Sequence, residues 1–305
     1  MKITETKELR NEEIKQPFFS IVICNYNYGQ FIGQTIESCL KQNYPEENFE
    51  IIVVDDGSTD NSREVIQRYS EENNIKFFFQ DNQGQAAAFN TGVSNAKGKF
   101  ICLLDSDDLF LANKLNLVNK RISKYKSVPK YFFLCNDLFI MDNASEKYLN
   151  KTWFQSINLS MLSLEMLVPG QYNFQYPFAF PAGQVYSKAL LEDILKKIKH
   201  CDWKQGADSP IAHGALLLAD AVHYEYEALG VYRIHGNNHF MGIDGQNNPK
   251  AKINYSSRTP KLINFLSELL ESDLMQENGA NIKRYEYIET LKELLESELA
   301  SGAKK

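Results

Sequence analysis

Three carboxylates in four positions follow a short apolar run in the first half of the chain. Residues 100–104 are Phe-Ile-Cys-Leu-Leu, and Asp105, Asp107 and Asp108 come directly after them. An apolar run of this length between charged residues is typical of a strand buried on both faces. The acids repel one another, and Mg²⁺ or Mn²⁺ commonly bridges such carboxylates to substrate phosphates. A solvated turn that caps the next helix is the alternative.

Two more polar groups follow apolar runs upstream. Asn25-Tyr26-Asn27 comes after the run 18–24, and Asp55-Asp56 comes after the run 49–54. The pattern predicts strands at 18–24, 49–54, 75–79 and 100–104, separated by helices at 31–42, after Thr59 or Asp60, and at 85–96. Strands that alternate with helices indicate right-handed βαβ units and a parallel sheet, whose strand ends share one edge. A nucleotide-sized ligand with a metal fits that edge.

The second half of the chain is less regular. The pattern predicts a strand at 131–141, loops over the sheet at 150–183, helices at 190–198 and 213–221, strands at 222–226 and 228–233, and turns at 236–250. Two amphipathic helices, at 262–270 and 288–299, close the chain. They pack on the core or, alternatively, form an oligomer contact or dock on a membrane surface, although the Glu-rich face of the last helix disfavours an anionic membrane.

Composition excludes several classes of protein. Lys and Arg number 33 and Asp and Glu 39, so the net charge is −6, which argues against a general nucleic-acid binder. The five cysteines are scattered without a CxxC pair, so neither a disulfide framework nor a zinc site is indicated. Residues 1–16 are polar, unlike a signal peptide, and no apolar run reaches the roughly 18 residues of a spanning helix. We expect a cytoplasmic protein, free or peripheral at the inner face of the membrane.

An ordered set of motifs resembles the family 2 glycosyltransferases, which are inverting enzymes with a GT-A fold. The motifs are residues 19–27, Ser38-x-x-x-Gln42, residues 53–60 (Val-Val-Asp-Asp-Gly-Ser-Thr-Asp), Asn82-Gln-Gly84, Asn90-x-Gly92, Ala96-x-Gly98 and the DxD-type segment 104–108. The resemblance weakens through 130–200 and returns at Gly206-Ala-Asp208 and at Tyr232-Arg-Ile-His235. It implies a Rossmann-like, mostly parallel sheet flanked by helices, with a leader at 1–16, a nucleotide-sugar half at 17–110, an acceptor half at 111–245 and a helical extension at 246–305.

The resemblance also implies roles for individual residues. Asp208 matches the family's general base, which takes a proton from the acceptor hydroxyl, and Asp107, Asp108 and His235 are the expected ligands of Mn²⁺ or Mg²⁺. The expected nucleotide contacts are Cys24, Asn25, Tyr26, Asp55, Asp56, Gln85 and Asp105. Asp56 matches the residue that reads the base, and Asp105 either contacts the ribose or helps to hold the metal.

Plainer alternatives stay open for several of these residues. Asp208 stands two residues before Pro210, so it also suits a helix N-cap, and Asp202 is the second candidate for the base. Asp56 suits the cap of the helix after Gly57, and His239 competes with His235. Trp153, Phe174, Tyr176 and Trp203 suit a saccharide or a lipid-linked acceptor, or fill the core.

One position departs from the family. Phe89 stands where relatives usually have Arg, directly before Asn90, so a basic contact is missing or comes from Lys97, Lys99 or Arg233. The expected activity is transfer from a UDP- or dTDP-sugar to a hydroxyl of a saccharide or lipid-linked glycan, as in polysaccharide assembly. The alternative is an inactive nucleotide-binding or scaffold protein on the same fold. A nucleotidyltransferase is disfavoured, because no Gly-rich phosphate loop follows the first strand.

Overall fold

A computed structural model describes residues 18–156, 180–236, 238, 249–274, 289 and 293, with the backbone alone for 249–257 and 259. The expected leader at 1–16, His239 and most of the last predicted helix lie outside these residues. The strands are β1 (Phe19–Asn25), β2 (Phe49–Asp55), β3 (Ile75–Phe79), β4 (Phe100–Asp105), β5 (Leu109–Phe110), β6 (Phe132–Asp142), β7 (Lys147–Thr152), β8 (Gln184–Ser187) and β9 (Ala221–Ile234). The helices are α1 (Gly29–Leu40), α2 (Ser62–Gln67), α3 (Gln85–Asn95), α4 (Lys114–Ile122), α5 (Trp153–Ser156), α7 (Lys188–Lys197), α8 (Asp208–Leu218) and α9 (Pro249–Leu270). Short 3-10 turns lie at Glu46–Asn48, Pro181–Gly183 and His200–Asp202.

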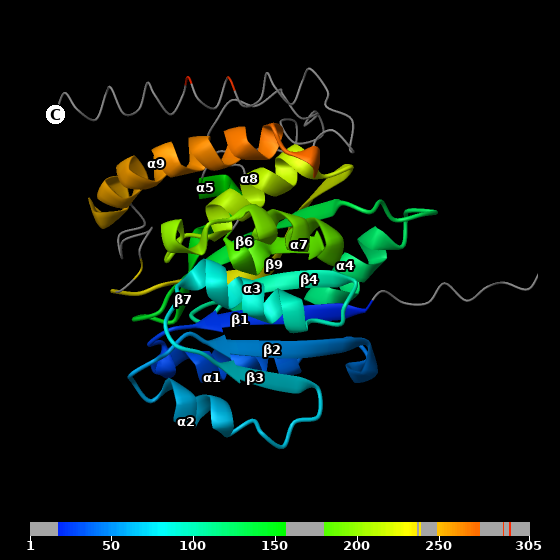
Figure 1. Cartoon of the computed structure of the whole chain (residues 1–305). Helices are drawn as coiled ribbons and strands as arrows, with labels where there is room; N and C mark the ends of the chain where they lie inside the picture. Colours follow the sequence, from blue (N-terminus) through cyan, green and yellow to red (C-terminus); the bar gives the residue numbers. More distant parts are fainter. Residues whose placement is uncertain are drawn as a thin grey trace, which may run out of the picture.

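The described strands form one mixed sheet in the order β3-β2-β1-β4-β8-β6-β9-β5, with β7 paired to β6. The first four strands are mutually parallel, as the apolar pattern predicts. β8 runs antiparallel between β4 and β6, and β9 pairs parallel with β6. The architecture is therefore an α/β fold with a curled sheet flanked by helices (Figure 1).

The strand register brings the polar residues to one edge. Asn25 pairs with Asp55 across β1 and β2, and Cys24 pairs with Asp105 across β1 and β4. All these strands are parallel, so their carboxyl ends emerge together. The shared edge of parallel strands, which the sequence predicts, brings these residues together, and the observed order β3-β2-β1-β4 makes them neighbours.

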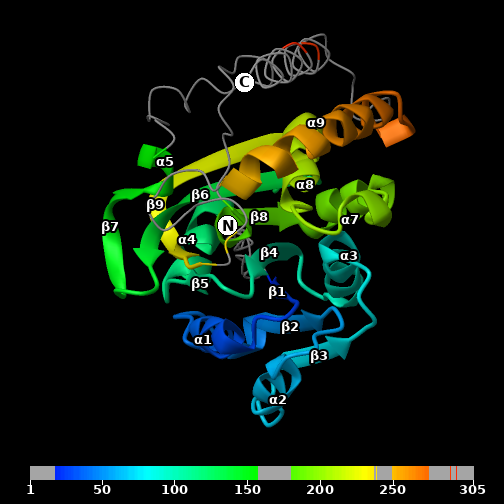
Figure 2. The same cartoon turned by 90° about the vertical axis from the view of Figure 1, so that its left-hand side faces the viewer.

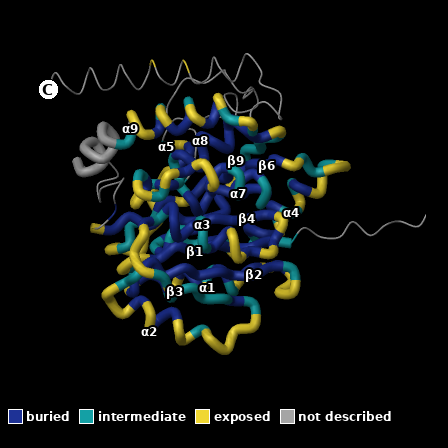
Figure 3. Tube along the Cα trace, in the orientation of Figure 1, coloured by how far each residue is buried: buried dark blue, intermediate teal, exposed yellow. Residues whose placement is uncertain are grey.

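Helices pack against the sheet and against one another. α3 packs on β1 and β2, α7 lies between α3 and α8, and α9 packs on α8. Figures 1 and 2 show α9 at one end of the molecule over α8, and α2 beside β3 at the other end. The burial map in Figure 3 is darkest along the central strands, where β1 and β2 are buried at every residue. Among the described helices, none is both long and apolar enough to cross a bilayer.

Several elements of the second half differ from the prediction. Helix α4 and strand β8 were not predicted, although Leu115, Val118 and Ile122 of α4 have helical spacing and are all buried. The two strands predicted on either side of Glu227 are one strand, β9, whose pairing with β6 shifts register at that point. The loop predicted from residue 150 is wrong for 150–156, which complete β7 and form α5, while residues 157–179 lie outside the described structure.

Candidate active site

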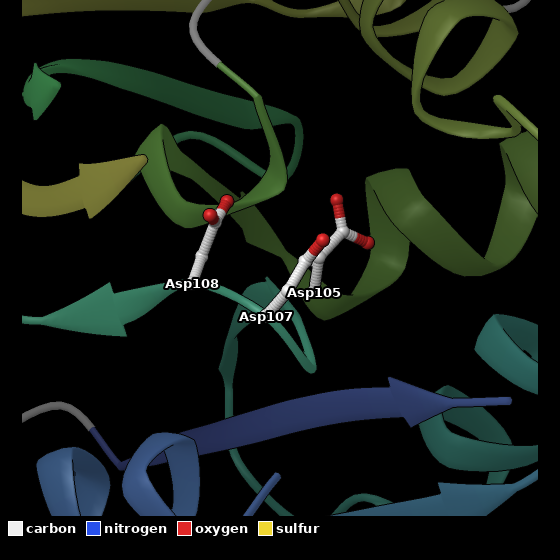
Figure 4. A group of neighbouring side chains, drawn as sticks. All are labelled: Asp105, Asp107 and Asp108. Atoms are coloured by element: carbon white, nitrogen blue, oxygen red, sulfur yellow. The ribbon is translucent and has the colours of Figure 1, made fainter. Parts of the chain in front are cut away.

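The three clustered carboxylates project from the loop that joins β4 to β5. Figure 4 shows Asp105, Asp107 and Asp108 on the same side of this loop. One oxygen of each can be chosen so that all three lie within 4.8 Å of one another. Asp105 is the last residue of β4, and Asp108 precedes β5 by a single position, so the two strands fix both ends of the loop. The geometry brings together the three acids that the sequence indicated.

Side chains behind the loop hold its backbone. Thr35 of α1 places its hydroxyl 2.8 Å from the carbonyl oxygen of Ser106 and 2.9 Å from that of Asp108. The buried Arg233 of β9 donates its backbone N–H to Asp108 Oδ1 at 3.0 Å, and its guanidinium donates to the carbonyl oxygen of Asp107. The same guanidinium donates to Gln34 and, at 3.2 Å, to Thr35. Arg233 is fully buried, and its Nε, Nη1 and Nη2 each donate one hydrogen bond inside the protein, so a phosphate contact from this side chain stays a prediction.

The cluster has the chemistry of a site for a hard divalent cation. Among the residues that the structure describes, Asp108 Oδ2 is buried and has no hydrogen-bond partner. Burial and the neighbouring carboxylates raise the pKa of Asp108 and of Asp105 well above the usual range. An unpartnered buried oxygen is costly, and a cation with oxygen ligands both neutralises the charges and accepts that oxygen as a ligand. The residues present therefore fit Mg²⁺ or Mn²⁺.

His235 lies directly beside the cluster. Its Nε2 is 3.0 Å from Asp107 Oδ2, and its ring packs against Phe31 with the centroids 4.6 Å apart. The ring of Tyr28 meets it edge-on at 5.8 Å. Two aromatic rings thus fix the imidazole plane, and a histidine more than 120 residues away in the chain faces the acidic loop. Packing of β9 beside β5 produces this contact.

The end of β1 and β2 carries a polar network. Asn25 Nδ2 donates to Asp55 Oδ1 at 2.7 Å and to Ser58 Oγ at 3.1 Å, and Ser58 Oγ donates to Asp55 Oδ1 at 2.6 Å. Asn25 and Asp55 are buried, whereas Tyr26 is 45% exposed. The Asp55 carboxylate thus holds the turn after β2 through hydrogen bonds. Cys24 is buried next to Asp105, and burial raises the pKa of its thiol, so this side chain is an inert neutral group.

Asp56 organises the loop between β3 and α3. Its carboxylate accepts hydrogen bonds from Gln80 Nε2 at 2.7 Å, from the backbone N–H of Gln83 at 2.9 Å and from that of Gly84 at 2.7 Å. The capping alternative for Asp56 is wrong, because α2 begins only at Ser62, whose N–H donates to Asp60. A carboxylate has about four acceptor positions, so three donors leave room for one more.

Gln85, the first residue of α3, links the two halves of the site. Its Nε2 donates to Asp105 Oδ1 at 3.0 Å, and its Oε1 accepts the N–H of Ala207 at 2.9 Å. The side-chain amide is therefore shared between the acidic loop and the residue before Asp208. The family resemblance implies a nucleotide contact for Gln85, which stays a prediction, and no local pattern indicates its bond to Ala207.

Asp208 is the first residue of α8 and shares the site with the acidic loop. Ala207 takes the N-cap position, so the interpretation of Asp208 as an N-cap is wrong. Its charge is close enough to contribute to the raised pKa of Asp105. Burial raises the pKa of Asp208 itself, and Arg258 of α9 opposes that rise. The second candidate, Asp202, instead lies beside Lys261, whose Nζ donates to the Asp202 carbonyl at 3.3 Å.

The aromatic candidates that the structure describes belong to the core. Trp153 and Trp203 are each only 2% exposed, and Phe89 is fully buried in α3. Phe174 and Tyr176 lie outside the described residues. Thr35 and Arg258 are the contributors that sequence reasoning missed, since each stands in an ordinary helical segment with no motif around it.

Comparison with known proteins gives a consistent result. Residues 20–195 match the family described as glycosyl transferase family 2. An uncharacterized glycosyltransferase of Nostoc sp. is 33% identical over 236 residues, which are 76% of this chain and 70% of that protein. Among solved structures, residues 1–349 of Staphylococcus aureus TarS align with a TM-score of 0.59 at 19% identity, over 84% of this chain and 66% of that one.

A second solved structure, the mannosyltransferase PcManGT of Pyrobaculum calidifontis, aligns with a TM-score of 0.55 at 16% identity. The alignment covers 95% of this chain and 76% of that one. At such identities the structures establish the fold, while the family match and the Nostoc relative establish descent. The chain therefore belongs to glycosyl transferase family 2 and is a glycosyltransferase with a GT-A fold.

Proposed function

We propose that this chain is a metal-dependent, inverting glycosyltransferase that moves a sugar from a UDP- or dTDP-sugar to a hydroxyl of a saccharide or lipid-linked glycan. The observation that carries the proposal is the group of three carboxylates with the buried, unpartnered Oδ2 of Asp108, faced by the charge of Asp208. TarS has been solved with UDP and with UDP-GlcNAc, and PcManGT with GDP-Man and Mn²⁺. These complexes support a nucleotide-sugar donor for this chain.

The acidic loop is the proposed cation site. Asp107 and Asp108 are the proposed ligands, with His235 beside Asp107 and with Asp105 as either a further ligand or a ribose contact. A bound divalent cation would stabilise the negative charge that develops on the leaving diphosphate. Thr35 and Arg233 keep the loop backbone in place and thereby orient the carboxylates.

The proposed proton acceptor is Asp208. In a single displacement the acceptor hydroxyl attacks the anomeric carbon from the face opposite the leaving group, so the configuration inverts and a carboxylate takes the hydroxyl proton. A raised pKa suits this task, because it brings the base closer to neutral pH. The Gln85 amide ties the position of Asp208 to that of Asp105 through Ala207.

The nucleotide is proposed to lie along the ends of β1 and β2. The exposed ring of Tyr26 and the backbone groups of Cys24 and Asn25 border this edge. Asp56 is the proposed acceptor for a base N–H, through the acceptor position that its three protein donors leave.

Calorimetry tests the donor proposal. We expect UDP or dTDP to bind in the presence of Mn²⁺, and to bind much more weakly in EDTA; GDP forms the comparison arm. If none of the three nucleotides binds with Mn²⁺, the proposal fails. Asp208→Asn should keep nucleotide binding and lose sugar transfer, and retained transfer would remove Asp208 as the base.

The burial of Phe89 motivates a second candidate, an inactive nucleotide-binding or scaffold protein. Phe89 is fully buried where relatives usually carry Arg, and so it offers no contact to a nucleotide. The discriminating measurement is release of nucleotide from a panel of UDP-, dTDP- and GDP-sugars with Mn²⁺. Slow release that disappears in Asp208→Asn excludes the inactive alternative.

A further inference from the structure

Arg258 brings a positive charge to the active site from the C-terminal helix. It lies on α9, outside the segment 20–195 that matches the family. Its guanidinium packs against Gly206, two residues before Asp208: a Cβ built on Gly206 would lie 2.2 Å from Arg258 Nη1 and 2.9 Å from Cζ. The positive charge of Arg258 also favours the ionised form of Asp208 and opposes the rise in pKa that burial causes.

Helix packing fixes where Arg258 stands. On α9, the residues that follow it, Leu262, Phe265, Leu266 and Leu269, are buried, and α9 packs on α8, the helix that begins at Asp208. Leu269 lies 3.5 Å from the position of a Cβ on Gly214 of α8, so the two helices approach closely. Figures 1 and 2 show α9 lying along α8 in both views. The guanidinium is therefore carried by a helix that is anchored to the helix of the base.

The backbone of the contacted turn leaves room for the guanidinium only because residue 206 is glycine. Gly206 has φ +70°, a left-handed conformation that favours glycine, and any side chain there would occupy the space of the Arg258 guanidinium. The next residue, Ala207, donates its N–H to Gln85 Oε1 at 2.9 Å. The turn before Asp208 is thus contacted both by α3 and by α9.

We propose that Arg258 is a positioning residue for sugar transfer, holding the Gly206–Asp208 turn so that the Asp208 carboxylate stands ready beside the acidic loop. The proposal rests on the proposed function of Asp208 as the base. It assigns the C-terminal helix α9 a part in the chemistry, in addition to its packing on the core.

The experiment compares Arg258→Met with a matched control on the same helix. Lys261→Met removes a positive charge three residues on, where the Lys261 Nζ donates to the carbonyl oxygen of Asp202 and pairs with its carboxylate. The assay is nucleotide release from the sugar donor that wild type hydrolyses fastest with Mn²⁺, with kcat and KM measured across pH. Calorimetry with UDP and Mn²⁺, together with thermal unfolding, reports whether each variant keeps its fold and its nucleotide site.

The expected result for Arg258→Met is a fall in kcat of roughly 10- to 100-fold with little change in donor KM, since a misplaced base slows the chemical step and leaves donor binding intact. The acidic limb of the kcat–pH profile should move to higher pH, because the charge that favours ionised Asp208 is gone. Arg258→Lys should recover part of the rate, and Lys261→Met should match wild type.

Other outcomes overturn the inference. Unchanged kcat and pH profile in Arg258→Met, or an equal loss in Lys261→Met, would show that Arg258 does not position the base. A rise in donor KM at constant kcat would instead make Arg258 a donor-binding residue. These results differ from failure of the proposed function itself, in which wild type neither binds nucleotide nor releases it from any donor.

Discussion

Replacing Asp108 by Asn should stabilise the protein in EDTA and remove its stabilisation by Mn²⁺. The three carboxylate oxygens lie within 4.8 Å of one another, and two unit charges at that separation repel by about 3.5 kcal/mol at an effective dielectric of 20 and by about 0.9 kcal/mol in bulk water. Asn keeps an oxygen that can accept the N–H of Arg233, so the hydrogen bond behind the loop survives. Attraction between Asp108 and the Arg233 guanidinium offsets part of the repulsion.

The direction of the net effect follows from the pKa of Asp108. Burial and the neighbouring acids raise this pKa above its value in the unfolded chain, so the native cluster favours the neutral form. The stability that this group contributes is present at low pH and is lost as the pH rises through the folded-state pKa. In EDTA, the advantage of Asp108→Asn over wild type should therefore be small at about pH 3.5, below the pKa of Asp in the unfolded chain, and reach about 1 to 3 kcal/mol at pH 8.

Thermal unfolding measures both parts of this prediction. At pH 8 in EDTA, Asp108→Asn should unfold roughly 2 to 6 °C above wild type, taking about 2 °C per kcal/mol for a chain of this size. Saturating Mn²⁺ at 100 times its Kd should stabilise wild type by about 2.7 kcal/mol and the variant far less. Asp81→Asn, at an exposed position, is the control and should change neither value. A variant less stable than wild type in EDTA, or one equally stabilised by Mn²⁺, would refute the reasoning.

Three further perturbations follow from the packing around the site. Gln85→Leu removes the bonds to Asp105 and Ala207 and should lower the free energy of unfolding by about 1 to 3 kcal/mol, measured in urea, with slower nucleotide release. Phe89→Arg places a charge in a fully buried site and should cost about 3 kcal/mol or more, also measured in urea. Burial lowers the pKa of Lys114 to about 8, below its value of about 10.4 in the unfolded chain. The unfolded chain therefore binds more protons between these values, and stability rises with pH. Wild type should gain about 3 kcal/mol of stability over Lys114→Met as the pH rises from 8 to 10.5. Unfolding in urea at stepped pH checks the last prediction. The first argument fails if Gln85→Leu is as stable as wild type, and the second fails if Phe89→Arg is stable and binds nucleotide more tightly. The third fails if the stability difference between wild type and Lys114→Met does not change with pH.

Local sequence was sufficient for the part of the fold that holds strands β1 to β4. The strands β1 to β4 are short, mostly apolar segments separated by segments with helical spacing, so their type and parallel direction follow from periodicity and the handedness of βαβ units, whereas their order across the sheet comes from the structure. Their carboxyl ends necessarily meet, which places Asn25, Asp55 and Asp105 at one edge. The position of Asp105 at the end of an apolar run is the feature by which the sequence indicates the acidic loop.

The later strands β8 and β9 depended on contacts that no local pattern encodes. β8 has four residues, Gln-Val-Tyr-Ser, and is a strand because it fills the gap between β4 and β6. β9 is continuous because its pairing with β6 tolerates a register shift near Glu227, where the alternation breaks. In both cases the partner strand, rather than the segment itself, determines the secondary structure.

By itself, the sequence determined the family, the parallel half of the sheet and the acidic loop, because apolar periodicity and a few polar residues at strand ends express these features locally. Only the tertiary structure decided which groups satisfy one another. The Arg233 guanidinium donates to the loop backbone, and Asp56 accepts hydrogen bonds from the 80–84 loop. Gln85 and Arg258 both contact the turn before Asp208. These contacts join residues 24 to 126 positions apart, and their geometry depends on how the helices pack on the sheet, which side-chain identity alone does not specify.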